Sequence, residues 1–462
     1  MFKTLANAWK IKDLRDKILF TIMIILIYRI GASVTVPFVD ASAVSNLLDG
    51  KINLGGYWFN TGNNVLNFMN TLSGGALANA SLFALGVSPY ITASIVIQLL
   101  TIAIPALERL SKQGEEGKEK ITAITRYVTM GISLITAIGY YFYIKYQATG
   151  LMQGCSGFWY AVVIIACYCA GASLVMWLAE KINEKGIGNG VSIILFANIV
   201  SRFSAIVMNF VEVIKALKNA KPEVIVVPSI LLPLSLIAML GMIWFIIFIS
   251  DSERRIPVQY AKKVVGRKMY GGRNTNLPIK LNMTGVMPII FANAILTLPG
   301  MIFSFIETDA NSFWGKVSAF FSNTSSWFFV LMTFILILAF AYFYVAISFN
   351  PVEVAQNLQQ NGGSIPGIRP GKPTSTFIKK VLSKITLIGA LALSVVAVLP
   401  PLGQLILTWL YDWTGNVGFM YSVITEFVSG GSSVIIVVGV ILETVREIEA
   451  QMTMRHYKGF LD

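Results

Sequence analysis

Long apolar stretches recur along the chain and alternate with shorter segments that carry most of the charged residues. A helix that crosses a lipid bilayer needs about 20 consecutive, mostly apolar residues. We therefore expect ten membrane-spanning helices. They cover residues 18–38, 82–105, 121–145, 158–179, 189–211, 224–250, 285–306, 327–349, 378–408 and 432–453. This pattern predicts an all-α polytopic membrane protein.

The first apolar stretch could be either a cleaved signal peptide or a retained helix. It follows the basic lead MFKTLANAWKIKDLRDK and continues into VTVPFV. A signal peptide has an apolar core of about 7–15 residues and a cleavage site of small residues. Because the run here is longer, we expect a retained helix. The segments between the stretches are too short for a sizeable soluble domain.

Composition and charge support this interpretation and add an orientation. Hydrophobic residues make up 55% of the 462 residues and charged residues 13%, whereas a soluble protein has about 25% charged residues. With the N-terminus inside, 28 of the 36 Lys and Arg residues fall in the cytoplasmic segments 1–17, 106–126, 180–186, 251–282, 350–384 and 443–462. Because Lys and Arg accumulate on the cytoplasmic side, we expect both termini there.

The sequence offers little catalytic or metal-binding chemistry. Cys155, Cys167 and Cys169 match no zinc spacing, so we interpret them as small apolar residues. The one histidine, His456, follows the last stretch. The chain contains neither an HExxH motif nor a GxxxxGK[ST] phosphate-binding motif. We therefore expect no cofactor, no metal and no enzymatic activity.

Charged residues are missing from the centres of the predicted spans. Arg29 and Arg202 lie near outer ends, and Glu180 and Lys181 lie at a cytoplasmic end. An ion-coupled transporter usually keeps Asp, Glu or His inside the membrane. The pattern argues against a secondary transporter but leaves a channel open.

The second and seventh predicted spans carry unusually many small polar residues, among them Thr92, Gln98 and Asn293. Such groups can hydrogen-bond between helices, but each bond contributes only about 0.6 kcal/mol in a membrane protein. The residues either support ordinary helix packing or mark a contact that can open.

Residues 65–80, VLNFMNTLSGGALANA, are too short to span a membrane and are interrupted by glycines. They could form a re-entrant segment, an interfacial helix or a loop. Re-entrant backbone is tolerated only where protein buries it or where it lines a cavity. Together with residues 82–105, this segment is typical of a broken helix that enters a funnel.

Two further segments are rich in glycine or proline. EKGIGNGVSIILF, residues 184–196, contains three glycines, but no strand precedes it, so it indicates a tight turn capped by Asn189 rather than a dinucleotide loop. SIPGIRPGKPT, residues 364–374, predicts a stiff cationic loop without regular structure.

Six segments in register resemble the SecY family, whose members form the central subunit of the protein-conducting channel. The resemblance covers about residues 15–455 and rests on GGALANASLFALGVSPYITASIVIQLL, EKGIGNGVSI, RRIPVQYAKK, LPIKLNMTGVMPIIFA, FNPVEVAQNLQQNGGSIPGIRPG and the basic ends. The spacing is most similar to bacterial members.

The resemblance implies an hourglass pore between two inverted five-helix halves, residues 1–211 and 212–462. It implies a ring at the constriction formed by Val87, Ile91, Val191, Leu195, Ile290 and Ile436. The family favours isoleucine in this ring, so the ring here remains aliphatic but slightly wider.

The same resemblance implies a plug and a lateral gate. The plug would be residues 65–79, with Val65, Leu66, Phe68, Met69, Leu72, Gly74 and Gly75. The gate would lie between spans two and seven, flanked by spans three and eight, and would include Thr92, Gln98 and Asn293.

The cytoplasmic segments 251–282 and 350–377 are implied to dock the SecA motor ATPase or the ribosome. The docking residues would be Arg254, Arg255, Lys262, Lys263, Arg267, Lys268 and, at the loop tip, Arg369. For Lys280, Lys379, Lys380 and Lys384, near span ends, we favour a topological role. The family also implies SecE and SecG subunits, signal peptides and nascent chains as partners, contact with lipids, and the cell membrane as location.

Two functions remain in competition at this stage. The first is a passive protein-conducting channel, driven by a partner. The alternative is a transporter or channel for small solutes with the same ten spans. The basic cytoplasmic loops favour the first, because a solute carrier has no need of them.

Overall fold

The computed structural model describes residues 7–49, 51–54, 57–60, 64–147, 151–152, 157–219, 222–260, 263–265, 268–270, 274–304, 315–317, 321, 326–414 and 418–458. Each of the ten predicted stretches coincides with a long helix in this part of the chain. These helices are α2 (Lys12–Ser33), α5 (Ser88–Ala103), α7 (Glu115–Phe142), α8 (Phe158–Lys185), α9 (Gly190–Asn219), α10 (Pro222–Asp251), α11 (Met287–Ser304), α13 (Trp327–Ser348), α15 (Lys372–Thr414) and α16 (Gly418–Lys458).

Length and hydropathy single out fewer spans than ten within the described residues. Four helical segments there are long and apolar enough to cross a membrane, Glu115–Lys145, Phe158–Lys185, Trp327–Gln360 and Lys372–Gly403. A fifth is possible if a bent pair of helices counts as one span. The chain is therefore a multi-pass membrane protein, and the number ten stays a prediction.

The bent pair begins in the second predicted span and extends beyond its predicted end. Residues 82–87 form turns, α5 begins only at Ser88, and a 104° bend separates it from α6 (Pro105–Ser111). Proline lacks the backbone N–H that would continue a helix, and it disfavours helical backbone at the preceding residue. Pro105 therefore ends α5 and redirects the chain.

Short elements lie between the long helices. The first half of the segment 65–80 is helical and belongs to α4 (Asn64–Leu72). Turns follow α4 up to the start of α5. The other short helices are α3 (Ala41–Asp49), α14 (Pro351–Gln360) and the π-helix η1 (Tyr143–Gln147). Asn189 caps α9 as expected, because its Oδ1 accepts from the backbone N–H groups of Val191 (3.1 Å) and Ser192 (3.4 Å).

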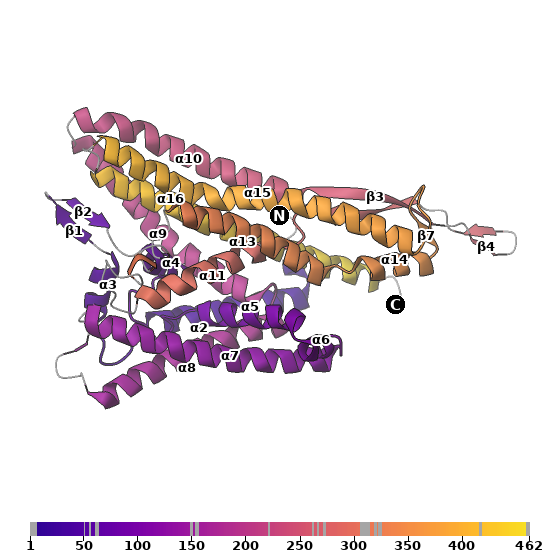
Figure 1. Cartoon of the computed structure of the whole chain (residues 1–462), viewed down its shortest axis with the longest axis horizontal. Helices are drawn as coiled ribbons and strands as arrows, with labels where there is room; N and C mark the ends of the chain where they lie inside the picture. Colours follow the sequence, from indigo (N-terminus) through magenta and orange to yellow (C-terminus); the bar gives the residue numbers. More distant parts are fainter. Residues whose placement is uncertain are drawn as a thin grey trace.

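The helices form two layers (Figure 1). Helices α2, α5, α7 and α8 lie in one layer, and α10, α13, α15 and α16 lie in the other, with α9 and α11 between them. Helix α9 contacts α16, and α11 contacts both α5 and α4, so these two helices join the layers. The largest hydrophobic cluster draws buried residues from both layers and lies where they meet.

Strands occur at the two ends of the helices, and the sequence analysis did not anticipate them. β1 (Lys51–Leu54) pairs with β2 (Tyr57–Asn60) at one end. At the other end, β3 (Glu253–Tyr260) is the centre of a sheet with β6 (Asn274–Lys280) and β7 (Gly363–Ser364). A hairpin of β4 (Lys263–Val265) and β5 (Lys268–Tyr270) extends beyond this sheet (Figure 1).

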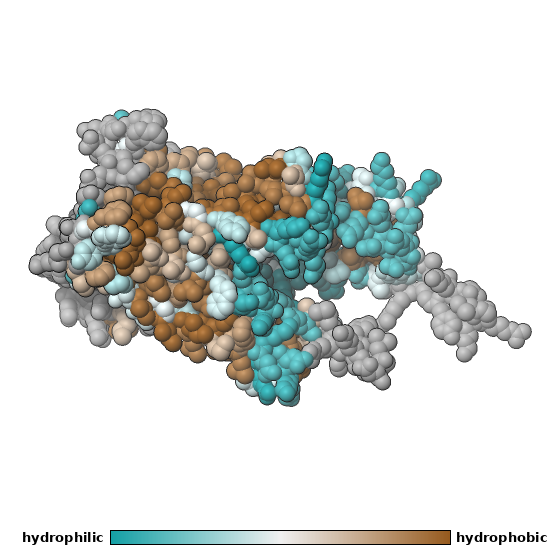
Figure 2. All heavy atoms as spheres, turned by 90° about the horizontal axis from the view of Figure 1, so that it is seen from below, coloured by the Kyte–Doolittle hydropathy of each residue, from teal (hydrophilic) through white to brown (hydrophobic). Residues whose placement is uncertain are grey.

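The hydropathy of the surface changes along the long axis of the molecule. Figure 2 shows a broad apolar surface over the helices and a hydrophilic surface gathered at the end that carries α6, α14 and the three-stranded sheet. Large apolar side chains such as Ile30, Ile135 and Ile388 are exposed on the helices. An apolar surface of this extent is stable in lipid rather than in water.

Candidate functional site

The six residues of the predicted ring come together in the largest hydrophobic cluster. Val87 directly precedes α5, Ile91 lies in α5, and Leu195, Ile290 and Ile436 lie in α9, α11 and α16. These five side chains are at most 5% exposed, and the half-buried Val191 packs against the same cluster. Segments as far apart in sequence as residues 87 and 436 thus build one aliphatic centre.

A cavity of about 40 Å³ connects this ring with the predicted plug and gate. Ring, plug and gate each contribute to its lining, with Ile91, Leu195, Ile290 and Ile436 from the ring, Met69 and Leu72 from α4, and Thr92 and Asn293 from the gate helices. Most of the lining is apolar. Residues from three groups that the same resemblance implies therefore line a single space, whereas Val87, Val191 and Gln98 do not line it.

The two predicted gate helices contact each other beside this cavity. Helix α5 packs on α7, α11 packs on α13, and α5 touches α11. The hydrogen bonds described for their polar side chains stay within each helix. Gln98 Nε2 donates to Ser94 Oγ at 3.1 Å, and Thr297 Oγ1 donates to the carbonyl of Asn293 at 2.8 Å. Among the residues that the structure describes, α5 and α11 therefore meet through packing.

The predicted plug consists of α4 and the turns that follow it. Helix α4 contacts both α9 and α11. Leu66 and Met69 are buried in a second cluster, which includes Tyr140 and Tyr168 of α7 and α8. Gly74 and Gly75 follow the helix with φ values of 68° and 88°, a conformation that favours glycine. The side chains of Val65 and Phe68 lie outside the described residues.

Polar side chains from α2 and α9 reach the end of α4. Arg29 and Asn198 donate to backbone carbonyls of residues 72–74, and Arg202 donates to Thr71. The sequence analysis noted the two arginines only as charges near outer ends of spans. It missed Asn198, because an asparagine within an apolar stretch carries no pattern that identifies its partner.

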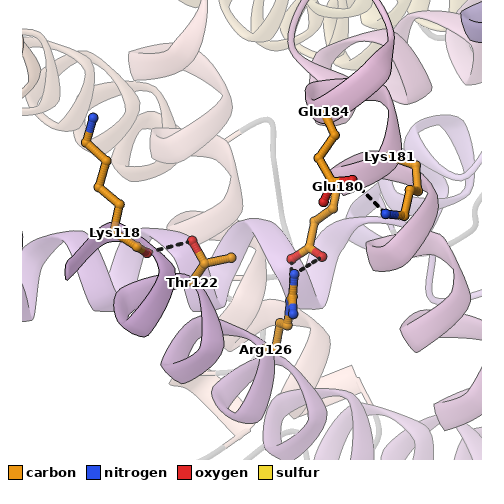
Figure 3. Close-up of polar contacts among 6 residues, drawn as sticks. All are labelled: Lys118, Thr122, Arg126, Glu180, Lys181 and Glu184. Carbon is orange, nitrogen blue, oxygen red and sulfur yellow. Dashed lines mark hydrogen bonds and ion pairs between the residues drawn. The ribbon is translucent and has the colours of Figure 1, made fainter. Parts of the chain in front are cut away.

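Charged residues also pair between α7 and α8. Arg126 and Glu180 form an ion pair, and Lys181 pairs with Glu184 along α8 (Figure 3). Thr122 donates to the carbonyl of Lys118 within α7. These contacts involve the cytoplasmic ends that the charge pattern predicts.

The two predicted docking loops are joined into one unit. Strand β3 of the first loop pairs antiparallel with β7 of the second, with Gln259 opposite Ser364 and Tyr260 opposite Gly363. A separate hydrophobic cluster containing Ile256, Ile279, Ile365 and Ile378 lies beneath this sheet. The loops therefore have a core of their own.

The predicted docking cations lie at different places in this unit. Arg254 and Arg255 are exposed on β3, and Arg255 Nε lies 2.7 Å from Glu253 Oε1, so Arg255 is already paired. Lys263 and Lys268 belong to β4 and β5, but their side chains lie outside the described residues, as do Lys262 and Arg267. Lys280 is the last residue of β6. Partial burial of its ammonium group and the neighbouring positive charge of Arg446 lower its pKa.

Arg369 is exposed on a short loop with a fixed backbone. Gly367 and Gly371 flank it with φ values of 81° and 96°. The Thr374 hydroxyl donates to the Arg369 carbonyl at 2.8 Å. The expectation of a loop without regular structure over residues 364–374 holds for residues 365–371, but Ser364 belongs to β7 and residues 372–374 belong to α15. Proline at the second helical position is compatible with this start, because the first N–H groups of a helix have no intrahelical partner.

The described residues offer no metal chemistry. They contain no group of three His, Cys, Asp or Glu residues that could hold a metal ion. Cys167 and Cys169 are free, half-buried thiols.

A second cavity, of about 230 Å³, lies near the start of α11 and is lined in part by Glu443, Arg446 and Lys280. The sequence analysis assigned none of these three residues to a pore.

Comparison with known proteins decides the family. The sequence model of the SecY family matches residues 81–445. Proteins named protein translocase subunit SecY from Streptomyces coelicolor and Mycobacterium tuberculosis are each 39% identical, over 472 and 474 residues that cover 100% of both chains. The chain belongs to the SecY family. The resemblance seen in the six sequence segments is thereby confirmed.

Solved structures share the fold of this chain at low sequence identity. The structure of a protein-conducting channel has a TM-score of 0.61 at 15% identity, covering 95% of this chain and 92% of the other. Sec61 in the canine ribosome–channel complex from the endoplasmic reticulum has a TM-score of 0.57 at 13% identity, with the same coverage. At such identities the likeness concerns the fold.

Proposed function

We propose that the chain is the channel subunit of a protein translocase, which passes unfolded polypeptides through its ring and releases apolar segments sideways into lipid. The observation that carries this proposal is the cavity shared by ring, α4 and the two gate helices. Membership of the SecY family supports the same function. In this proposal the chain itself is not an enzyme, and a partner supplies the energy.

The aliphatic ring suits a channel for chains of any sequence. A narrow apolar constriction blocks ions by dewetting. Charged side chains at the same place would bind some passing segments and repel others. Val87, Ile91 and Leu195 carry no polar group, so they can surround a polypeptide without holding it.

The contact between α5 and α11 suits lateral release. A segment of ten leucine-like residues gains roughly 3–6 kcal/mol on entering lipid. A single charge at the membrane centre costs about 2.5–3.5 kcal/mol. In the described residues α5 and α11 meet through packing, and a gain of this size would offset part of the packing energy that is lost when they separate. The gate needs only to open at times, and partitioning then sorts the segments.

The wider architecture is part of the proposal. Ten spans would form two inverted halves, residues 1–211 and 212–462, with both termini in the cytoplasm of a bacterial cell. The sheet of β3, β6 and β7 would then face the cytoplasm. Its exposed Arg254 and Arg369 would contact an acidic surface of the SecA motor or phosphates of ribosomal RNA. SecE and SecG would be the accompanying subunits.

A crosslinking experiment tests the ring. A photoreactive residue at Ile91 should capture a stalled secretory chain in membranes that contain the complete translocase. The same residue at Ile388, which is 57% exposed on α15, should capture lipid but not the chain. Equal capture at both positions, or passage of small solutes without any protein passage, would overturn the proposal.

A further inference from the structure

The end of α4 is bound by a side chain that also joins two other helices. Arg29 of α2 donates from Nη2 to the carbonyls of Ala197 (2.9 Å) and Asn198 (3.4 Å) in α9. Its Nη1 donates to the carbonyl of Gly74 at 3.4 Å. One guanidinium therefore connects α2, α9 and the turn after α4. A lysine, with a single nitrogen at its tip, cannot reach both sides in this way.

Two residues of α9 add contacts to the same turn. The fully buried Asn198 donates from Nδ2 to the carbonyl of Leu72 at 2.8 Å and to the hydroxyl of Tyr28 at 2.9 Å. Arg202, one turn further along α9, donates from Nη1 to Thr71 Oγ1 at 3.2 Å. Three donors from two helices thus converge on residues 71–74.

One of the three acceptors is a backbone carbonyl at the end of a helix. Helix α4 ends at Leu72, and the last carbonyls of a helix lack intrahelical donors and carry partial negative charge. The carbonyl of Leu72, the last residue of α4, receives its donor from Asn198 instead, and the carbonyl of Gly74, in the turn beyond the helix, receives one from Arg29. Cationic and amide donors at this place therefore complement α4 electrostatically as well as by hydrogen bonding.

The close approach requires glycine at position 74. A Cβ at this residue would lie 2.8 Å from Arg29 Nη1 and 3.0 Å from Asn198 Oδ1. The φ value of 68° independently disfavours any other residue. The backbone of the turn is thus placed directly against the donors, with no room for a side chain between them.

We propose that Arg29, Asn198 and Arg202 form a latch that holds the plug in its closed position. This inference rests on the proposed role of residues 65–79 as a plug. All three latch residues lie in residues 1–211, whereas the cluster that buries Leu66 and Met69 touches α11 through Leu298. Within the described residues, the plug is therefore fastened to the first half by polar bonds, and its contact with the second half is apolar. Tyr140 of α7, also in the first half, donates its hydroxyl to the carbonyl of Leu77 at 2.6 Å. When the halves separate, the plug leaves α11 first and stays with the first half until these bonds break.

The test measures ion leak through the complete translocase in planar bilayers, without substrate. Arg29→Met should raise the leak about tenfold or more, since hydrogen bonds to a charged group are lost. Arg29→Lys should give a smaller rise, and Arg202→Gln, which removes one contact, a smaller rise still. Each variant is compared at equal amounts of purified complex.

Deletion of residues 65–79 separates the possible outcomes. The deletion should raise the leak, and Arg29→Met should then add nothing, because the latch no longer has anything to hold. A matched control is the double variant Arg126→Gln and Glu180→Gln, which removes a polar contact elsewhere in the first layer and should leave the leak unchanged. If the deletion leaves the leak unchanged, the plug assignment is wrong. If the deletion leaks but Arg29→Met does not, the latch is wrong. The latch is also wrong if Arg29→Met adds as much leak to the deletion variant as it adds to the unmodified chain.

Discussion

Arg126 of α7 and Glu180 of α8 form a forked ion pair, in which Nε lies 2.9 Å from Oε1 and Nη2 lies 2.8 Å from Oε2 (Figure 3). The two partners differ in exposure, since the side chain of Glu180 is 9% exposed and that of Arg126 is 49% exposed. The carboxylate therefore depends on its partner far more than the guanidinium does. The loss of one partner should therefore have a different effect on stability from the loss of the other.

Arg126→Ala should destabilise the protein more than Glu180→Ala. Without Arg126 a nearly buried carboxylate loses its partner, which costs about 2–3 kcal/mol. Without Glu180 the half-exposed guanidinium can turn to water, and the loss should be about 1 kcal/mol. The thermal unfolding midpoint of the purified complex in one detergent measures both. Equal shifts for the two variants would contradict the argument.

The helices could be predicted from the sequence because each apolar run is a local property of consecutive residues. The ends of the helices were less certain, since they depend on single residues. Pro105 ends α5 early and bends the chain, and Pro373 allows α15 to begin at Lys372. Asn189 was predictable as a cap, because the residues that it binds are only two and three positions away.

Contacts between distant segments could not be predicted from the residues alone. The pairing of Gln259 with Ser364 joins two loops 105 residues apart, and neither loop has a clear strand pattern. The bond between Asn198 and Leu72 joins segments 126 residues apart. The ring residues were found through the family resemblance, because an aliphatic residue in an apolar span has no local mark of function.

Two neighbouring glycines provide a matched test of crowding at the end of α4. Gly74 and Gly75 both have positive φ, but a Cβ at Gly75 would meet nothing within 4 Å. Ala at either position should cost about 1–2 kcal/mol from backbone strain alone. Gly74→Ala should cost more, because its methyl group also displaces Arg29 and Asn198.

Unfolding midpoints and ion leak of the two alanine variants distinguish the contributions. We expect Gly75→Ala to lower the midpoint with little change in leak. Gly74→Ala should lower the midpoint further and raise the leak. Identical behaviour of both variants would mean that the donors around Gly74 are not positioned by its lack of a side chain.

Arg369 provides the last prediction, and the geometry of its loop makes the prediction specific. The Arg369 side chain is exposed, whereas Ile365 of the same loop is buried and the Thr374 hydroxyl donates to the Arg369 carbonyl. A change of the side chain should therefore leave the loop in place. We expect Arg369→Glu to insert into the membrane and to assemble with the SecE subunit normally. Export driven by the SecA motor should fall about tenfold or more, since reversal of a contact charge weakens docking.

Arg369→Lys should be partly defective, because a planar guanidinium makes forked hydrogen bonds that an ammonium cannot reproduce. Lys380→Glu is the matched control, since Lys380 is also exposed but lies in α15, nearer the membrane. The measurement is ATP-dependent protection of a precursor from protease in proteoliposomes that contain equal amounts of each variant. If Arg369→Glu exports as well as the unmodified chain, Arg369 does not dock the motor. If Arg369→Glu fails to insert, the charge of Arg369 sets membrane topology instead of binding a partner. The positive charge of the loop that precedes α15 would then account for an arginine at this position.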